Sequence, residues 1–386
     1  MDTVICGSSA FQYWRTPPIV ELLAAGPSDY PGLCRFVDEE TLLGFRNDLI
    51  SSLPLPRACA AGPTWHHAGP ILKTVREYQL LLAPGADLPL KVMIDEAKDR
   101  RATSIVKTML WKGPLPHCST EQIAEGLEVT TPAFTMLQLA HEASLTKTVL
   151  MASELCGNYA VFHAPPVIAR QVQSMIDHQR LPELDGWRPC LSAGGKLTDL
   201  WSRPALLEPN DLVDIAERSD SRNGKATLLK AAELVKPAAA SPFESQAGVL
   251  LGFPKRLGGE GLGGFSHNEK VDLTPDARLL AQRKCCYCDL YWPDGLDVEC
   301  QSTQHHSAEG DYLSDSDRTA ALKLAGFEVL PLTYAQMRDE TRFDAFVLAV
   351  EQALGRKPRP KTSRQVNATR ELRNEVFVDW WNLPNS

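Results

Sequence analysis

The sequence predicts an α/β protein with a mixed sheet flanked by helices in its C-terminal domain, preceded by an α+β N-terminal region. Residues 287–292 and 296–300 are rich in aromatic and apolar side chains, as in two strands joined by a tight turn. Residues 315–325 then predict a helix that ends at Gly326, and residues 327–332 an apolar strand. A strand–helix–strand connection after a hairpin favours a sheet with both antiparallel and parallel neighbours.

The region before this domain also alternates between strand and helix patterns. Residues 90–94, 104–111 and 127–129 predict strands, and residues 133–140 predict a helix with apolar side chains at helical spacing. Thr131 is a good N-cap residue for that helix, and Pro132 fits its first position. Three more helices are predicted at 147–156, 210–218 and 225–235.

The turn of the hairpin determines which residues of its two strands face each other. Pro293, Asp294 and Gly295 form a three-residue loop in which glycine accepts the left-handed conformation. In that register Asp289 lies directly opposite Glu299, on the same face and with Cβ atoms about 5 Å apart. A two-residue Asp-Gly loop would put the two acids on opposite faces. We prefer the longer loop because proline cannot donate a ladder hydrogen bond.

Two carboxylates at that distance repel each other unless one takes a proton or both share a cation. A hard divalent ion such as Mg²⁺ prefers oxygen ligands and keeps several waters, one of which it can activate. Gln301 lies two residues beyond Glu299 and therefore on the same face. The pattern indicates a magnesium site, and the alternative is a solvent-exposed hairpin whose acids are simply hydrated.

The spacing of these residues resembles the core of PD-(D/E)xK nucleases, and the surrounding stretch is similar to the very-short-patch-repair-like endonuclease group. The resemblance covers roughly residues 241–355. Its separate pieces occur in the order typical of that group: Asp289 with Trp292-Pro293, Val298-Glu299 with Gln301, His306, Asp317-Arg318, and Ala325-Gly326-Phe327 with Val329-Leu330. Gln301 departs from the pattern, because the group usually has aspartate there and the wider superfamily lysine.

This resemblance implies a restriction-endonuclease-like fold that hydrolyses DNA phosphodiester bonds with Mg²⁺ or Mn²⁺. Asp289 and Glu299 would be metal ligands, and Glu244 on the preceding helix a third. Gln301 would orient a water, and His306 would lie near the scissile phosphate. Glu244 also stands where a capping-box acid stands behind Ser241, and the two roles are compatible.

Three basic residues are candidates for contacts with the nucleic-acid backbone. Arg318 lies on the helix after the hairpin, where an exposed arginine without such a role is the commoner case. Lys255 and Arg256 lie in a glycine-rich stretch, residues 252–264, which we interpret as a mobile or phosphate-contacting loop. That stretch lacks the glycine fingerprint of a nucleotide site, so no nucleotide cofactor is expected.

The strand and helix at 129–140 resemble the region that precedes the nuclease domain in the same group. They also resemble the body of abortive-infection antitoxin-type regulators, which indicates a structural or regulatory role. We therefore divide the chain into an N-terminal region (1–110), a recognition or regulatory region (111–236), a nuclease-like domain (237–355), and a basic linker with an aromatic tail (356–386). The aromatic tail should dock on the body of the protein or on a partner.

Cysteines near the hairpin raise the possibility of zinc. Cys285, Cys288, Cys300 and His305 could supply four ligands. Against this, strand alternation points neighbouring cysteines to different faces, and the hairpin register pairs Cys288 with Cys300 opposite the acids. Zinc is therefore the less favoured metal.

Composition limits where the protein works and what it binds. No apolar run approaches the length of a membrane span, and the first residues lack the pattern of a signal peptide, so we expect a cytoplasmic protein with reduced thiols. The net charge of −8 is unfavourable for gripping DNA, which usually needs a basic face. The main hypothesis is a metal-dependent endonuclease. The alternative is a catalytically inactive DNA-binding regulator or antitoxin-like protein that keeps the nuclease fold.

Overall fold

The computed structural model describes residues 3–25, 87–100, 102–301 and 309–385, and the separate positions 40, 44, 47 and 48. The strands are β1 (Thr3–Ile5), β2 (Leu90–Ile94), β3 (Val106–Leu110), β4 (Thr120–Ala124), β5 (Leu127–Thr130), β6 (Tyr159–Val161), β7 (Arg188–Leu191), β8 (Leu197–Ser202), β9 (Ser266–Asp272), β10 (Cys285–Trp292), β11 (Leu296–Gln301) and β12 (Glu328–Thr333). The helices are α1 (Gly7–Arg15), α2 (Pro18–Ala25), α5 (Pro132–Glu142), α6 (Leu145–Leu155), α7 (Pro166–Asp177), α8 (Pro209–Arg218), α9 (Lys225–Leu234), α10 (Pro242–Gly252), α11 (Pro275–Ala281), α12 (Glu309–Leu324), α13 (Tyr334–Arg338), α14 (Glu340–Ala353) and α15 (Ser363–Val376). Short 3₁₀ turns are η4 (Ala97–Asp99), η5 (Lys255–Leu257) and η6 (Leu383–Asn385).

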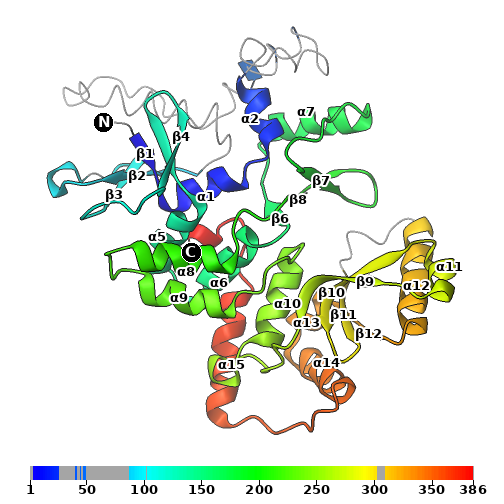
Figure 1. The fold of residues 1–386 in the computed structure, drawn as a ribbon. Coiled ribbons are helices and arrows are strands. Elements are labelled where there is room, and N and C mark those ends of the chain that lie inside the picture. The colour runs from blue at the N-terminus through cyan, green and yellow to red at the C-terminus, as the bar shows by residue number, and fades with distance from the viewer. Residues whose placement is uncertain are drawn as a thin grey trace.

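The described residues form three sheets, so the protein is a mixed α/β structure (Figure 1). The first sheet has the order β3-β2-β1-β5-β4, and the second, β6-β8-β7, is antiparallel. The third has the order β12-β11-β10-β9, with antiparallel neighbours except for the parallel pair β11–β12. Helix α12 connects that parallel pair, so the expected mixed sheet after the hairpin is confirmed.

Helices cover both faces of the third sheet (Figure 1). On one face α11 and α12 contribute Ala277, Ala321 and Leu322 to a small apolar cluster with Cys286 and Cys288 of β10. On the other face α10 lies against β10 and β11 and joins the main core of the protein. That core also contains buried side chains of α5, α6, α8, α9, α14 and α15, so it runs through most of the chain.

Local capping explains why α10 begins where it does. Ser241 is the N-cap residue, and its hydroxyl accepts a hydrogen bond from the backbone N–H of Glu244, while Pro242 occupies the first helical position. The prediction for α5 is right in position but wrong in mechanism. Thr131 is its N-cap residue, yet its hydroxyl donates to the carbonyls of Cys118 and Ser119 rather than capping the helix.

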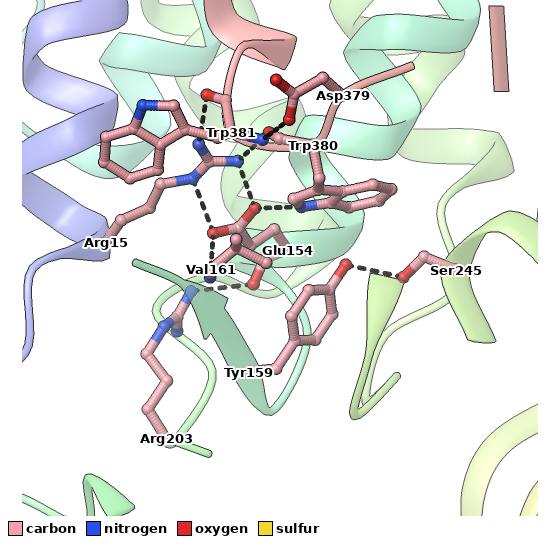
Figure 2. A network of polar contacts seen from close by, with 9 residues as sticks. All are labelled: Arg15, Glu154, Tyr159, Val161, Arg203, Ser245, Asp379, Trp380 and Trp381. Atoms are coloured by element: carbon pink, nitrogen blue, oxygen red, sulfur yellow. Dashed lines mark hydrogen bonds and ion pairs between the residues drawn. The ribbon is translucent and has the colours of Figure 1, made fainter. Parts of the chain in front are cut away.

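The aromatic tail docks on the body of the protein through a buried ion pair (Figure 2). Arg15 of α1 binds Glu154 of α6 at 2.7 Å, and both side chains are fully buried. The indole of Trp380 donates to Glu154 at 2.6 Å, and the backbone carbonyl of Trp380 accepts a hydrogen bond from Arg15. Arg203 donates to the backbone carbonyl of Glu154. One carboxylate therefore holds together an N-terminal helix, a central helix and the C-terminal tail.

The glycine-rich stretch after α10 is packed, which differs from the mobile loop that we expected. Gly258 has φ +91°, and an added Cβ would lie 2.2 Å from the carbonyl oxygen of Ala368 on α15. Leu262 is 1% exposed within the main core. Gly258 therefore allows close backbone contact with α15, because a side chain would not fit there.

We expect Gly258→Ala to lower the free energy of unfolding by at least about 2 kcal/mol, because a left-handed residue gains a Cβ and the Cβ meets a fixed backbone carbonyl. Gly326→Ala is a matched control. Gly326 has φ +93° but nothing within 4 Å of the added Cβ, so only the conformational cost of about 1 kcal/mol remains. Urea unfolding of both variants tests this, and equal losses would contradict the packing argument.

Candidate functional site

The candidate site lies at the open end of the β10–β11 hairpin. The strands pair Trp292 with Leu296, Tyr291 with Asp297 and Leu290 with Val298, which confirms the three-residue loop. Gly295 has φ +91°, as the turn chemistry requires. The paired ladder ends at Leu290–Val298, one step before Asp289 and Glu299.

Strand alternation changes at Asp289, and this separates the two acids. Cys286 and Cys288 pack in the cluster under α12, whereas Leu290 packs in the main core on the opposite face. Asp289 is therefore turned out of the regular pleat, and its carboxylate accepts a hydrogen bond from the backbone N–H of Cys300 at 2.8 Å. Glu299 instead binds Arg318 of α12. The expectation that both acids share one face is wrong, because it assumed an unbroken period of two.

Glu244 approaches the site from α10 through a buried carboxylate with several local hydrogen bonds. Its Oε2 accepts hydrogen bonds from the backbone N–H of Ala240 and from the Asn268 amide, and its Oε1 accepts from Ser241. Burial and the nearby charge of Asp289 raise its pKa to about 8. Glu244 therefore lies near the acid on β10, but its carboxylate binds the Ala240 amide and the Ser241 hydroxyl, so the expected capping box with the Ser241 backbone N–H is not formed.

Asp297 and Glu299 form a pair of buried carboxyl groups on β11. Burial raises the pKa of Glu299 to about 9, with a further contribution from Asp297, and burial also raises the pKa of Asp297. No described residue donates a hydrogen bond to Oε1 of Glu299 or to either Asp297 oxygen. Both carboxyl groups therefore favour the protonated form more than an exposed acid does, and the charge of Arg318 opposes this shift at Glu299.

A pocket of about 710 Å³ opens at Asp289, and Glu244, Asp297 and Glu299 do not line it. It is lined by Asn268, Arg283, Lys284, Cys285, Cys286, Tyr287, Asp289 and Arg318. Three cationic residues and one acid therefore line the same pocket, and Tyr287, which also lines it, is 54% exposed. Arg318 belongs both to the pocket wall and to the partly buried ion pair with Glu299, and it also donates to the carbonyl of Tyr287.

The carboxylates suit a hard divalent cation by their chemistry. Glu299 and Asp297 carry buried oxygens without a hydrogen-bond donor, and several acids close together raise one another's pKa. Their present positions are set by protein donors, chiefly Arg318 on Glu299 and the Cys300 amide on Asp289. Among the described residues, no three His, Cys, Asp or Glu side chains are grouped so as to hold a metal ion.

The remaining predicted residues are not all brought together. Gln301 ends β11 and is half-buried, paired with Thr333. Lys255 lies 3.9 Å from Glu351 of α14, and neither it nor Arg256 lines the pocket. His306 falls outside the described residues.

The structure does not bring together Cys288 and Cys300, two of the four candidate zinc ligands. Cys288 packs under α12, whereas Cys300 packs against the main core on the other face of the sheet. The predicted Cys288–Cys300 pair is therefore wrong for the same reason as the acid pair. His305 lies outside the described residues.

Sequence reasoning missed several residues of the site. Asp297 is fully buried beside Glu299, and its position two residues earlier on the same strand could have revealed it. Arg283 and Lys284, just before β10, supply two of the three cations in the pocket. Asn268 has φ +48° and links β9 to Glu244, a contact that no local pattern indicates.

Comparison of this chain with protein-family models, with curated proteins and with solved structures found no match. The functional argument therefore depends on the site itself. Within the described residues, no helix has the length and apolar character needed to cross a membrane.

His267 of β9 contacts the backbone of Asp289 and makes the free energy of unfolding depend on pH. Its ring bonds to the carbonyl of Asp289 at 3.1 Å, and burial lowers its pKa from 6.5 to about 4. The folded protein therefore keeps it neutral, whereas the unfolded chain takes up a proton below about pH 6.5. This stabilising contribution is present above pH 6.5 and is lost as pH falls towards 4, at up to about 1.4 kcal/mol per pH unit.

We expect His267→Gln to flatten the fall in unfolding free energy between pH 6.5 and 4, measured by urea unfolding at several pH values. Other acids titrate in the same range, so the comparison with wild type isolates this one group. His178→Gln is the matched control, since His178 is exposed. An unchanged pH slope in the His267 variant would contradict the assignment.

Proposed function

We propose that this protein is a nuclease that hydrolyses DNA phosphodiester bonds, and that β9–β12 with α10 and α12 form a restriction-endonuclease-like domain. The observation that carries the proposal is the pocket in which Asp289 lies among Arg283, Lys284 and Arg318. Hydrolysis of a phosphodiester is helped by cationic groups that stabilise charge on the phosphate and by carboxylates that hold a metal ion beside it.

The side chains of the pocket have separate roles in this proposal. Arg283 and Lys284 would bind the phosphate backbone and offset the acidic balance of the chain. Glu244, Asp289 and Glu299 would hold Mg²⁺ or Mn²⁺, which when bound supplies an activated water and stabilises charge on the phosphate. Because these acids are not grouped as a metal site in the described structure and Arg318 engages Glu299, binding of the ion would require Glu299 to leave Arg318 and turn towards Asp289. Gln301 would orient the attacking water, and His306 would assist proton transfer. Tyr287, exposed at the pocket edge, offers a surface on which a base can stack.

The direct test is cleavage of supercoiled, linear, mismatched and single-stranded DNA by the purified protein, with Mg²⁺, Mn²⁺ or a chelator. Metal-dependent cutting that the chelator stops is the expected result. A matching set of RNA substrates tells whether DNA is the preferred polymer. Absence of cutting on every substrate would overturn the catalytic proposal.

Two observations favour a second candidate, a DNA-binding regulator that keeps this fold without catalysis. Arg318 forms an ion pair with Glu299 and compensates its negative charge. Gln301 stands where active members of the resembled group have an acidic or basic residue. Fluorescence anisotropy with labelled DNA separates the two candidates. Salt-sensitive binding that Arg283→Gln and Lys284→Gln weaken, in a protein that cuts nothing, would favour the regulator.

A further inference from the structure

A second pocket, of about 590 Å³, is lined by residues at the start of α1 and near the C-terminal end of the chain. Helix α1 and the C-terminus lie away from β10 and β11 (Figure 1). The pocket is lined by Ser8, Asp87, Leu88, Pro89, Lys91, Lys107, Leu139, Glu142, Ala143, Pro384 and Asn385. Its volume is in the range of small-molecule sites, and one side of its wall is apolar.

The polar side of this pocket is built by the turn from β1 into α1. Gly7 has φ +56°, and its N–H donates to the buried amide of Gln138 at 2.9 Å, which fixes the turn. Ser8 and Ser9 follow in the first turn of the nine-residue helix, where backbone N–H groups lack an acceptor one turn earlier. The start of α1 therefore presents donors and a partial positive charge.

The hydroxyl of Ser8 supplies independent evidence for a ligand. Ser8 is 3% exposed and lines the pocket, and no described residue forms a hydrogen bond with its hydroxyl. Ser9 next to it is used differently, since its hydroxyl accepts from the backbone N–H of Lys91. Because no described residue uses this hydroxyl, it can form a hydrogen bond with a group bound in the pocket.

Two lysines add charge at the same place. A Cβ on Gly7 would lie 3.1 Å from Cδ of Lys91 and 3.9 Å from its Nζ, so that ammonium group lies over the positive end of the helix. Two positive groups side by side are unfavourable without an anion. Glu142 provides one at 3.0 Å, but its side chain is 46% exposed and so is held weakly. Lys107 also lines the pocket and forms no ion pair with a described residue.

We propose that this pocket binds a phosphate monoester, with the phosphate on Ser8, the first amides of α1, Lys91 and Lys107. The organic part would lie on the apolar wall of Leu88, Pro89, Leu139 and Pro384. Asp87, which accepts hydrogen bonds from Gln12 and Asn385, stands where it could also accept one from a ligand hydroxyl. The site is separate from the proposed nuclease centre and does not depend on it.

Calorimetric titration of the whole protein with AMP, adenosine and inorganic phosphate tests the proposal. AMP should bind with a dissociation constant below about 1 mM, and adenosine should not. Ser8→Ala, which removes a hydroxyl without adding volume, should weaken AMP binding roughly tenfold, and Lys107→Gln several-fold. Lys323→Gln, on the exposed surface of α12, is the matched control and should leave binding unchanged.

A 5′-phosphorylated trinucleotide identifies the source of the monoester, since tighter binding than AMP would indicate a nucleic-acid end and weaker binding a free nucleotide. Thermal melting shows whether the variants fold. If Ser8→Ala does not fold, Lys107→Gln still tests the proposal, because Lys107 is exposed and its substitution should not disturb the fold. The proposal is overturned if neither AMP nor phosphate binds at about 10 mM. It is also overturned if AMP binds equally to wild type and both pocket variants.

Discussion

Asp289→Asn and Glu299→Gln should each reduce metal-dependent DNA cleavage by about a hundredfold or more. Removing a carboxylate that holds the cation removes several kcal/mol of stabilisation of the developing charge, and each 1.4 kcal/mol is about tenfold in rate. The substitutions keep size and shape nearly constant. Each new amide can also keep a local partner through its carbonyl oxygen, which can accept from the Cys300 N–H in the first variant and from Arg318 in the second. The fold should therefore survive both changes.

Asp294→Asn is the matched control for this experiment. Asp294 sits in the turn at the far end of the same hairpin, is exposed, and does not line the pocket. The Asp294→Asn substitution also removes one negative charge from this hairpin, but at a distance from the pocket. The cleavage rate of this variant should therefore equal that of wild type. Equal cutting by wild type and both site variants would mean that the activity comes from another site or from a contaminant.

The outcome also distinguishes the two proposed functions. If Glu299 is needed mainly to hold Arg318, Glu299→Gln should disturb DNA binding and thermal stability without any cleavage to lose. If Glu299 holds the cation, cleavage should fall while DNA binding in the presence of a chelator stays constant. Measuring both quantities on the same preparations therefore assigns Glu299 to one role.

The parts of the fold that sequence predicted well are those governed by local chemistry. The Pro293-Asp294-Gly295 turn predicted the hairpin register because the φ preferences of its residues allow few alternatives. The capped start of α10 and the β2 strand were predicted for the same kind of reason. Each depends on residues within a few positions of one another.

The candidate site was predicted only in part, because its decisive contacts are distant in sequence. The change of alternation at Asp289 depends on how β10 packs between two clusters, which no period of two reveals. Arg318 reaches Glu299 across 19 residues, and Asn268 reaches Glu244 across 24. Sequence patterns identified the acids on β10, β11 and α10 but could not assign their partners.

Glu154→Gln should lower the free energy of unfolding by about 3–5 kcal/mol, the usual effect of removing one partner of a buried ion pair. Arg15 would remain fully buried with its charge uncompensated, because the new amide oxygen and the carbonyls of Trp380 and Trp381 are all neutral acceptors. Glu233→Gln breaks the surface pair with Lys230 and should change stability by less than about 1 kcal/mol. Urea unfolding followed by tryptophan fluorescence measures both.

A double-mutant cycle then separates the ion pair from the packing around it. Arg15→Met with Glu154→Met should destabilise the protein by clearly less than the sum of the single changes, because the double variant buries no unpaired charge. Some loss should remain, since the Trp380 indole and the Val161 amide also donate to this carboxylate. Strictly additive losses would show that Arg15 and Glu154 act independently. In that case the tail would be held by its apolar contacts, such as those of Trp380 and Leu383 with the main core, rather than by the shared carboxylate.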